Sequence, residues 1–175
     1  NKSTQVSPVS AKDVASEFGS SLKFILNGGN CKIGLESTVV DLTSRAKILR
    51  PGLINPSDIS KILNKKITIH KGSKAIKAPG MLKKHYSPGI PIKLNQKKAK
   101  NNEAFIVFGK KYKKAKNIFN LSSKSNLNVA ARNLYKILRL IKKKNYKMIC
   151  VSSIPQTGIG LAINDRLSRA AKWTH

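Results

Sequence analysis

The stretch KAPGMLKKHYSPGIP, residues 77–91, places three prolines and two glycines around a His-Tyr pair. Proline fixes the backbone angle φ and carries no N–H, so this stretch forms neither a helix nor a central strand. We interpret residues 71–90 as a linker that its prolines hold extended, unlike a flexible Gly/Ser linker. It divides the chain into an N-terminal segment, residues 1–70, and a C-terminal domain, residues 91–175.

The C-terminal domain alternates predicted strands with predicted helices. Its clearest helix spans residues 126–143, where apolar side chains recur at spacings of three and four residues and therefore share one face. A last helix is predicted over residues 161–171. Strands are predicted over residues 91–94, 104–108, 118–121 and 148–152. This alternation predicts a small α/β domain with a largely parallel sheet.

The N-terminal segment is also predicted to be α/β. A helix is expected over residues 11–18, with Ser10 as its N-cap and Gly19 at its end. A second helix is expected over residues 56–63, because a proline suits its first position. Strands are predicted over residues 23–27, 38–42, 48–50 and 67–70.

The chain is strongly basic, with a formal net charge of +28 from 35 Lys or Arg against seven acidic residues. Such a charge favours a polyanionic partner such as nucleic acid. However, most of the basic residues are lysines scattered among Asn and Ile, as in chains with a biased amino-acid supply, and aromatic residues make up only 6%. We therefore expect nonspecific attraction to phosphate rather than a specific RNA site.

The two cysteines, Cys31 and Cys150, lie far apart and lack metal-ligand spacing. They predict neither a disulfide framework nor a metal site, and they favour a reducing cytoplasm. No apolar run has the length of a membrane span, so no membrane partner is expected. The sequence also lacks a nucleophile elbow and a Walker loop.

Three stretches of the N-terminal segment carry polar side chains that suit a binding site. The first ten residues are rich in hydroxyl groups, among them Ser7. In GLESTVVDLT, residues 34–43, Glu36 precedes Ser37 at the beginning of a predicted strand, where a rigid sheet can fix side chains. In LRPG, Arg50 ends another strand and suits a bidentate grip on phosphate. The structural alternatives are a solvated loop, a capped turn and a surface ion pair.

The linker contributes His85 and Tyr86. Because no acidic residue lies near His85 in the sequence and two lysines precede it, its charged form is disfavoured and a role as general base is not expected. Tyr86 is suited to stacking on a base or donating its phenol hydroxyl. No catalytic side chain is predicted from the sequence.

Four stretches, taken together, resemble the threonylcarbamoyl-AMP synthase family. NKSTQVSPVSAKDV is similar to the end of the SANxSGxxSPTxAxxV motif of that family, and GLESTVVDLT followed by ILRPG resembles its next block. KAPGMLKKHYSPGIP resembles the interdomain linker of the long, two-domain members, and GIGLAINDRLSRAA resembles a helix near their C-terminus. The four stretches occur in the family's order and cover nearly the whole chain.

The resemblance implies a YrdC-like catalytic domain, a linker that returns over the catalytic cleft, and a small Rossmann-like domain. The family condenses L-threonine, bicarbonate and ATP into threonylcarbamoyl-adenylate and pyrophosphate, and a tRNA threonylcarbamoyl transferase complex uses the product. ATP would enter as a substrate with Mg²⁺, and no tightly bound cofactor is expected. By motif, Ser7, Arg50 and Tyr86 would contact ATP, and Ser37 would contact threonine.

The sequence departs from the family pattern at its beginning. The family motif starts with a Ser-Ala pair before the asparagine that matches Asn1, and a Lys-x-Arg motif lies further upstream. Thr4 replaces the usual Gly, and Val9 replaces the Thr after Ser-Pro. We therefore expect residues 1–70 to be an incomplete, C-terminal part of the YrdC-like domain, with an exposed sheet edge.

Two readings follow from this departure. In the first, the chain is the C-terminal portion of a threonylcarbamoyl-AMP synthase that is inactive alone. It would be a fragment of a longer protein, one half of a split enzyme completed by a separate N-terminal half, or a decayed remnant. In the second, it is a noncatalytic basic module that binds RNA or regulates a partner.

Overall fold

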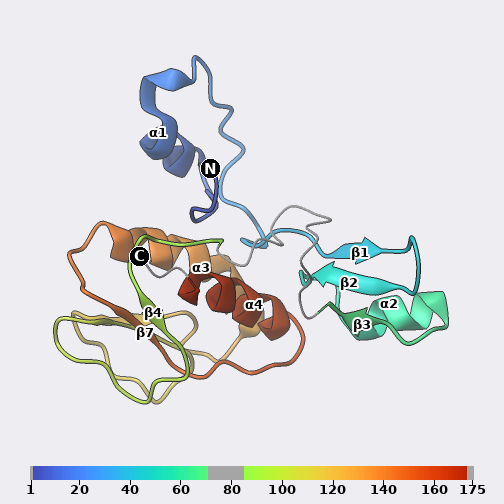
Figure 1. Cartoon of the computed structure of the whole chain (residues 1–175). Helices are drawn as coiled ribbons and strands as arrows, with labels where there is room; N and C mark the ends of the chain where they lie inside the picture. The colour runs from blue at the N-terminus through green and yellow to red at the C-terminus, as the bar shows by residue number, and fades with distance from the viewer. Residues whose placement is uncertain (1, 71–84, 173–175) are drawn as a thin grey trace.

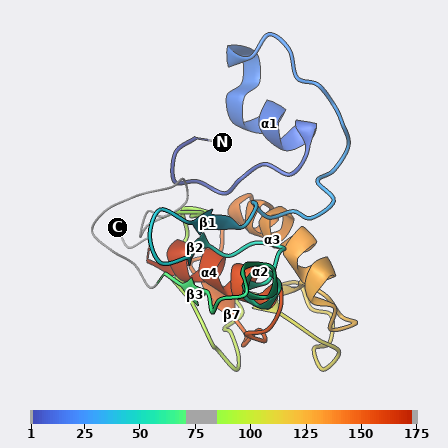
Figure 2. The ribbon, with the colours of Figure 1, turned by 90° about the vertical axis from the view of Figure 1, so that its right-hand side faces the viewer.

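The computed structural model describes residues 2–70 and 85–172, and Figure 1 shows their arrangement. Most of the expected linker, residues 71–84, lies outside the described residues. The elements after residue 85 form one body in which α3 and α4 cover a sheet, while β1, β2, β3 and α2 lie beside it. Helix α1 lies at the outside of this body in Figures 1 and 2, and its Glu17 pairs with Arg139 of α3.

The larger sheet has four strands, all parallel, in the order β4-β7-β5-β6. The strands are β4 (Ile92–Lys93), β5 (Ala104–Val107), β6 (Ile118–Asn120) and β7 (Ile149–Val151). Every residue of β5 and β7 is buried, as expected for central strands of a parallel sheet whose two faces are both covered. The sequence prediction of a largely parallel α/β sheet is therefore confirmed.

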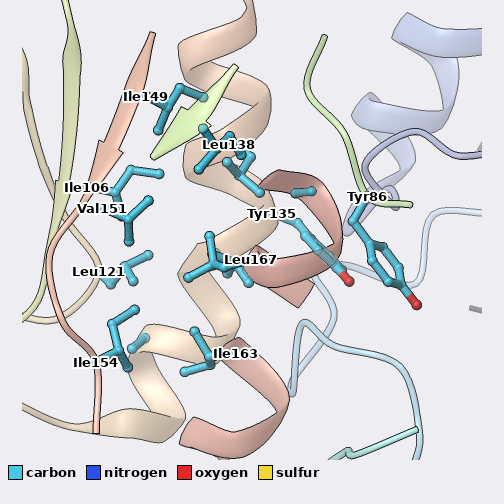
Figure 3. Close-up of a cluster of buried hydrophobic side chains, with 14 of the residues drawn as sticks. Tyr86, Ile106, Leu121, Tyr135, Leu138, Ile149, Val151, Ile154, Ile163 and Leu167 are labelled. Atoms are coloured by element: carbon cyan, nitrogen blue, oxygen red, sulfur yellow. The ribbon is translucent and has the colours of Figure 1, made fainter. Parts of the chain in front are cut away.

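Helices α3 (Leu127–Lys142) and α4 (Gly160–Ala171) form the core with this sheet. Asn126 caps α3 by accepting a hydrogen bond from the backbone N–H of Val129 at 3.0 Å. The apolar faces of both helices pack on the strands, and Figure 3 shows part of this cluster. Gly160 begins α4 where a Cβ atom would lie 2.1 Å from the carbonyl oxygen of Pro155. Any residue with a Cβ atom would clash there, which explains why a glycine occupies this position.

The smaller sheet has three strands in the order β1-β2-β3. Strands β1 (Val39–Asp41) and β2 (Lys47–Arg50) are antiparallel, whereas β3 (Thr68–Ile69) is parallel to β2. Helix α2 (Pro56–Leu63) is the crossover that this parallel pairing requires, and Pro56 occupies its beginning as predicted.

The N-terminal segment begins with α1 (Ala11–Phe18), which continues into a short 3-10 helix, η1 (Gly19–Ser21). Ser10 caps α1 by accepting from the N–H of Asp13, and Gly19 ends it at a φ of 53°. Both residues act as predicted.

The strand predicted over residues 23–27 is wrong. These residues form no strand in the part of the chain that the structure describes. The apolar pattern was misleading because Phe24 and Leu26 are 88% and 96% exposed, so none of the residues that the structure describes covers them. No described helix is long and apolar enough to cross a membrane.

Candidate functional site

Glu36 lies at the centre of a group of polar side chains that come from three segments. Its carboxylate accepts a hydrogen bond from Ser7 Oγ at 2.6 Å and from the Tyr135 hydroxyl at 2.9 and 3.1 Å. Arg166 Nε donates to the same carboxylate at 2.9 Å, and the Arg166 side chain is fully buried. The N-terminal segment, α3 and α4 therefore meet at one charged group.

This environment keeps Glu36 ionised. Burial alone would raise the pKa of the Glu36 carboxyl, but the charge of Arg166 and the hydrogen bonds from Ser7 and Arg166 outweigh it, so the pKa lies below its ordinary value. Burial, followed by the Glu36 charge, raises the pKa of the Tyr135 phenol well above its ordinary value. Tyr135 therefore keeps its proton and remains a donor to Glu36.

Glu36 is expected to make the stability of the fold depend on pH. Because its pKa is lower in the folded chain than in the unfolded chain, its stabilising contribution is complete above about pH 5 and is lost as the pH falls through the folded pKa. Glu36→Gln should be less stable than the wild type at pH 7 but should lose less further stability on acidification. Urea unfolding over a pH series measures this. An identical acid dependence in the two proteins would contradict the assignment.

Arg50 and Ser37 form the second part of the site. Arg50, at the end of β2, donates through Nε to the Ser37 carbonyl at 3.1 Å and through Nη2 to Ser37 Oγ at 3.3 Å. Gly52 allows this approach, because a Cβ atom there would lie 2.3 Å from the backbone N of Thr38. The turn after β2 therefore brings the Arg50 strand end beside the residue that follows Glu36.

Tyr86 enters the site from the end of the linker. Its side chain is 1% exposed, and its ring stacks on Tyr135 with the ring centroids 5.7 Å apart. The guanidinium of Arg166 lies 5.2 Å from the Tyr86 ring centroid, within cation–π range. Figure 3 shows both tyrosine hydroxyls pointing away from the apolar cluster.

The backbone holds Tyr86 in an uncommon conformation. Its φ is 61°, in the left-handed region that non-glycine residues rarely adopt. The next residue, Ser87, donates its backbone N–H to the Thr4 carbonyl at 3.0 Å, within a β-bridge between Gln5 and Ser87. The end of the linker is thus tied to the segment that carries Ser7, and such strain concentrates at functional sites.

His85 lies against Tyr86, with the ring centroids 4.0 Å apart. Burial lowers the pKa of its imidazole, with further lowering by nearby arginine charges and partial opposition from Glu36. The expectation that its charged form is disfavoured is confirmed in direction. The main cause is burial, whereas the sequence argument rested on lysines that lie outside the described residues. Sequence reasoning also missed the acidic neighbour, Glu36.

The structure brings the four predicted contact residues, Ser7, Ser37, Arg50 and Tyr86, around Glu36. Ser7 binds it directly, Ser37 follows it in the chain, and Arg50 binds Ser37. The charges of Arg166, Glu36 and Arg50 all act on the Tyr86 phenol, whose pKa is raised, first of all by burial. Residues from opposite sides of the linker therefore converge on one place.

Sequence reasoning missed two members of this site, Tyr135 and Arg166. Both lie on the buried faces of their helices. The signal that could have found Arg166 is a charged residue on an otherwise apolar helix face, since Ile163 and Leu167 are buried on the same side of α4. The described residues contain no group of three or more His, Cys, Asp or Glu side chains that could hold a metal ion.

Family models match both parts of the chain that contribute residues to this site. The family model described as "Threonylcarbamoyl-AMP synthase, C-terminal domain" matches residues 54–172. The Sua5/YciO/YrdC model, described as "Telomere recombination", matches residues 1–52.

Curated relatives named threonylcarbamoyl-AMP synthase match almost the whole chain. The Pyrococcus abyssi protein is 32% identical over 194 residues, covering 99% of this chain and 56% of the relative. The Bacillus subtilis protein is 29% identical, covering 98% of this chain and 55% of the relative. The chain thus spans about half the length of the curated relatives it matches.

Two solved structures of P. abyssi Sua5 have the same fold as this chain. A crystal structure of the complex with L-threonine aligns with a TM-score of 0.85 and 31% identity, covering 98% of this chain and 56% of that chain. The structure of a variant in which a histidine and the tyrosine after it are both replaced by alanine aligns with a TM-score of 0.81 and 29% identity, covering 98% and 55%.

Proposed function

The chain belongs to the threonylcarbamoyl-AMP synthase family, and we propose that it supplies the C-terminal part of the adenylate-forming site of such an enzyme. The enzyme condenses L-threonine, bicarbonate and ATP into threonylcarbamoyl-AMP. The observation that carries the proposal is the convergence of Ser7, Ser37, Arg50 and Tyr86 around one buried acid–base network. A transferase acting in tRNA modification is consistent with the names of the relatives.

The proposed roles follow from the chemistry of the reaction. The carbamate oxygen made from threonine and bicarbonate attacks the α-phosphorus of ATP, and pyrophosphate leaves with the electrons of the broken P–O bond. Negative charge grows on the phosphoryl oxygens, so fixed donors matter more than a protein base. Arg50 and Ser7 bind ATP, Ser37 binds L-threonine, and Tyr86 closes the nucleotide pocket against water.

Two structures of one relative, P. abyssi Sua5, support these assignments. L-threonine is the ligand of the P. abyssi Sua5 complex. The His-Tyr pair replaced in the second Sua5 structure has one counterpart in this sequence, the pair His85–Tyr86. Mg²⁺ enters bound to the phosphates of ATP, and no resident cofactor is proposed.

We propose the same domain organisation as in the long members of the family. Residues 1–70 form the C-terminal part of a YrdC-like domain, residues 71–90 the linker and lid, and residues 91–175 a Rossmann-like domain. The two separate sheets support this division, and the parallel sheet with α3 and α4 suits a Rossmann-like domain. Cys31 and Cys150 are both unpaired, which suits a cytoplasmic location.

Further polypeptide completes the catalytic domain, in line with the share of the relatives' length that the chain spans. The large apolar side chains that stay exposed support this. Among the described residues, all of them except Val129 and Leu140 lie between residues 22 and 62, namely Leu22, Phe24, Leu26, Ile33, Leu42, Leu53, Ile54 and Ile62. Exposed apolar side chains gathered in one stretch of the chain suit a surface that another segment covers. The N-terminal half of the catalytic domain, in the same or a separate chain, covers this surface.

Pyrophosphate release tests the proposal. The chain is mixed with ATP, bicarbonate and L-threonine, with and without the N-terminal half of the catalytic domain from a relative. Threonine-dependent release only in the presence of that half supports the proposal. The matched control replaces L-threonine with D-threonine. Absence of threonine-dependent release in both mixtures would contradict it.

Weak attraction to tRNA is a separate expectation. Ala99 and Tyr112 pack on one face of the larger sheet, so the lysine-rich loops that carry them, residues 97–100 and 110–116, lie over that face. Affinity for tRNA, measured by fluorescence anisotropy, should fall at least about tenfold between 50 and 200 mM salt, because lysine contacts release counterions. Salt-independent binding would instead favour a specific RNA-binding module.

The threonylcarbamoyl-AMP product is passed on to the tRNA threonylcarbamoyl transferase complex.

A further inference from the structure

We infer that Tyr135 and Arg166, from helices α3 and α4, are positioning residues for the proposed substrate site and act on it through Glu36. Neither residue belongs to the family motifs assigned above to ATP or threonine. The inference gives the C-terminal region a direct role in assembling the site, and it rests in part on the proposed function.

Glu36 transmits this effect because it lies between two of the proposed contact residues. Its carboxylate accepts from Ser7 Oγ at 2.6 Å, and Ser37 is the next residue in the chain. A fixed Glu36 therefore fixes the hydroxyl of Ser7 and the backbone of Ser37 together. Tyr135 and Arg166 supply the other donors to the carboxylate.

Arg166 orients two members of the site at once. Its Nε binds Glu36, its guanidinium lies over the Tyr86 ring, and its Nη1 binds Asp165 at 2.8 Å. Its Nη2 is buried with no hydrogen-bond partner among the described residues. A buried cation kept for stability alone is expected to pair all its donors, and apolar side chains in place of a whole buried ion pair are often more stabilising than the pair. The geometry therefore suits a positioning role.

Helix α3 reinforces the same segments through their backbones. Arg139 donates to the carbonyl of Val6 at 2.6 Å and to that of Ser7 at 3.2 Å. Arg132 donates to the Lys32 carbonyl at 2.8 Å. Gly34 lies directly against the same turn of α3, where a Cβ atom would be 2.6 Å from the Arg132 Cα. Helix α3 thus holds both chain segments that meet at Glu36.

The test removes one hydrogen bond without removing a ring. Tyr135→Phe deletes the donor to Glu36 and keeps the stack on Tyr86. Tyr146→Phe is the matched control, because its hydroxyl donates to the Lys116 carbonyl, outside the Glu36 network. In the pyrophosphate assay with the N-terminal half present, Tyr135→Phe should raise the KM for L-threonine and ATP about tenfold, the effect of about 1.4 kcal/mol. Tyr146→Phe should leave both KM values unchanged.

Arg166→Lys supplies a second measurement, because it keeps the charge and loses the oriented Nε. The KM values of Arg166→Lys for L-threonine and ATP should lie between those of the wild type and the higher values of Arg166→Met. Backbone amide hydrogen exchange of the chain alone measures how firmly the site is held, independently of activity. Tyr135→Phe should speed exchange at residues 5–8 and 34–38, whereas Tyr146→Phe should not.

The outcomes separate the two proposals. If the wild-type chain and the N-terminal half together release no pyrophosphate in response to L-threonine, the proposed function is wrong. The hydrogen-exchange experiment then still tests the positioning role of Tyr135. Exchange or KM values that are the same for Tyr135→Phe and Tyr146→Phe would overturn the inference even in an active enzyme.

Discussion

Arg166→Met is expected to lower the free energy of unfolding by about 3–5 kcal/mol, because it leaves the Glu36 carboxylate partly buried without its cation. Arg166 is fully buried and binds both Glu36 and Asp165. The methionine fills much of the same space, so the loss of charge dominates the change. Urea unfolding at pH 7 measures the effect.

A double-mutant cycle isolates the pair. Glu36→Gln in the Arg166→Met background should cost much less than Glu36→Gln alone, because there it removes a carboxylate that has already lost its cation. Independent, additive losses would show that the two side chains do not interact in solution.

Arg50→Ala is expected to lower kcat/KM for threonylcarbamoyl-AMP formation by about 100-fold or more, as for other donors that face a developing phosphoryl charge. Arg50 ends β2 and already donates to the backbone and hydroxyl of Ser37. Its loss removes a cation and loosens the proposed threonine contact. Pyrophosphate release in the presence of the N-terminal half measures the loss.

The matched control for this prediction is Arg45→Ala. Arg45 is an exposed arginine in the turn between β1 and β2, and its removal should leave kcat/KM unchanged. Equal losses in both variants would point to a general effect of charge on ATP attraction, without a specific grip by Arg50.

Local signals in the sequence predicted most of the fold. Ser10 and Pro56 predicted the beginnings of α1 and α2. The apolar residues spaced three and four positions apart predicted α3. Each signal depends on neighbours only a few residues away. The strand predicted over residues 23–27 failed because a strand needs a partner, and no described residue covers Phe24 or Leu26.

The site was predictable only in part for the same reason. Ser7, Ser37, Arg50 and Tyr86 belong to local motifs, so the family resemblance could select them. Their meeting at Glu36 depends on contacts far apart in the sequence. Arg166 reaches Glu36 across 130 positions and Tyr135 across 99. Composition and periodicity carry no information about such pairs, although a buried arginine on an apolar helix face gives a hint.

The proposed role of the linker as a lid depends on where Tyr86 lies. The linker is useful as a lid only if Tyr86 lies inside the site, and its side chain is 1% exposed between Arg166 and Tyr135. The lysines at residues 110–116 attract phosphate nonspecifically. Binding of ATP to these lysines is therefore the alternative to binding beside Tyr86.

Photolabelling with 8-azido-ATP tests the central claim most directly. The chain, assembled with the N-terminal half and L-threonine, is irradiated and digested with trypsin, and the labelled peptides are sequenced. The account predicts that label on the peptide of residues 85–93, which carries Tyr86, disappears when unlabelled ATP competes. Label that unlabelled ATP displaces only from other peptides, with none on the Tyr86 peptide, would contradict it.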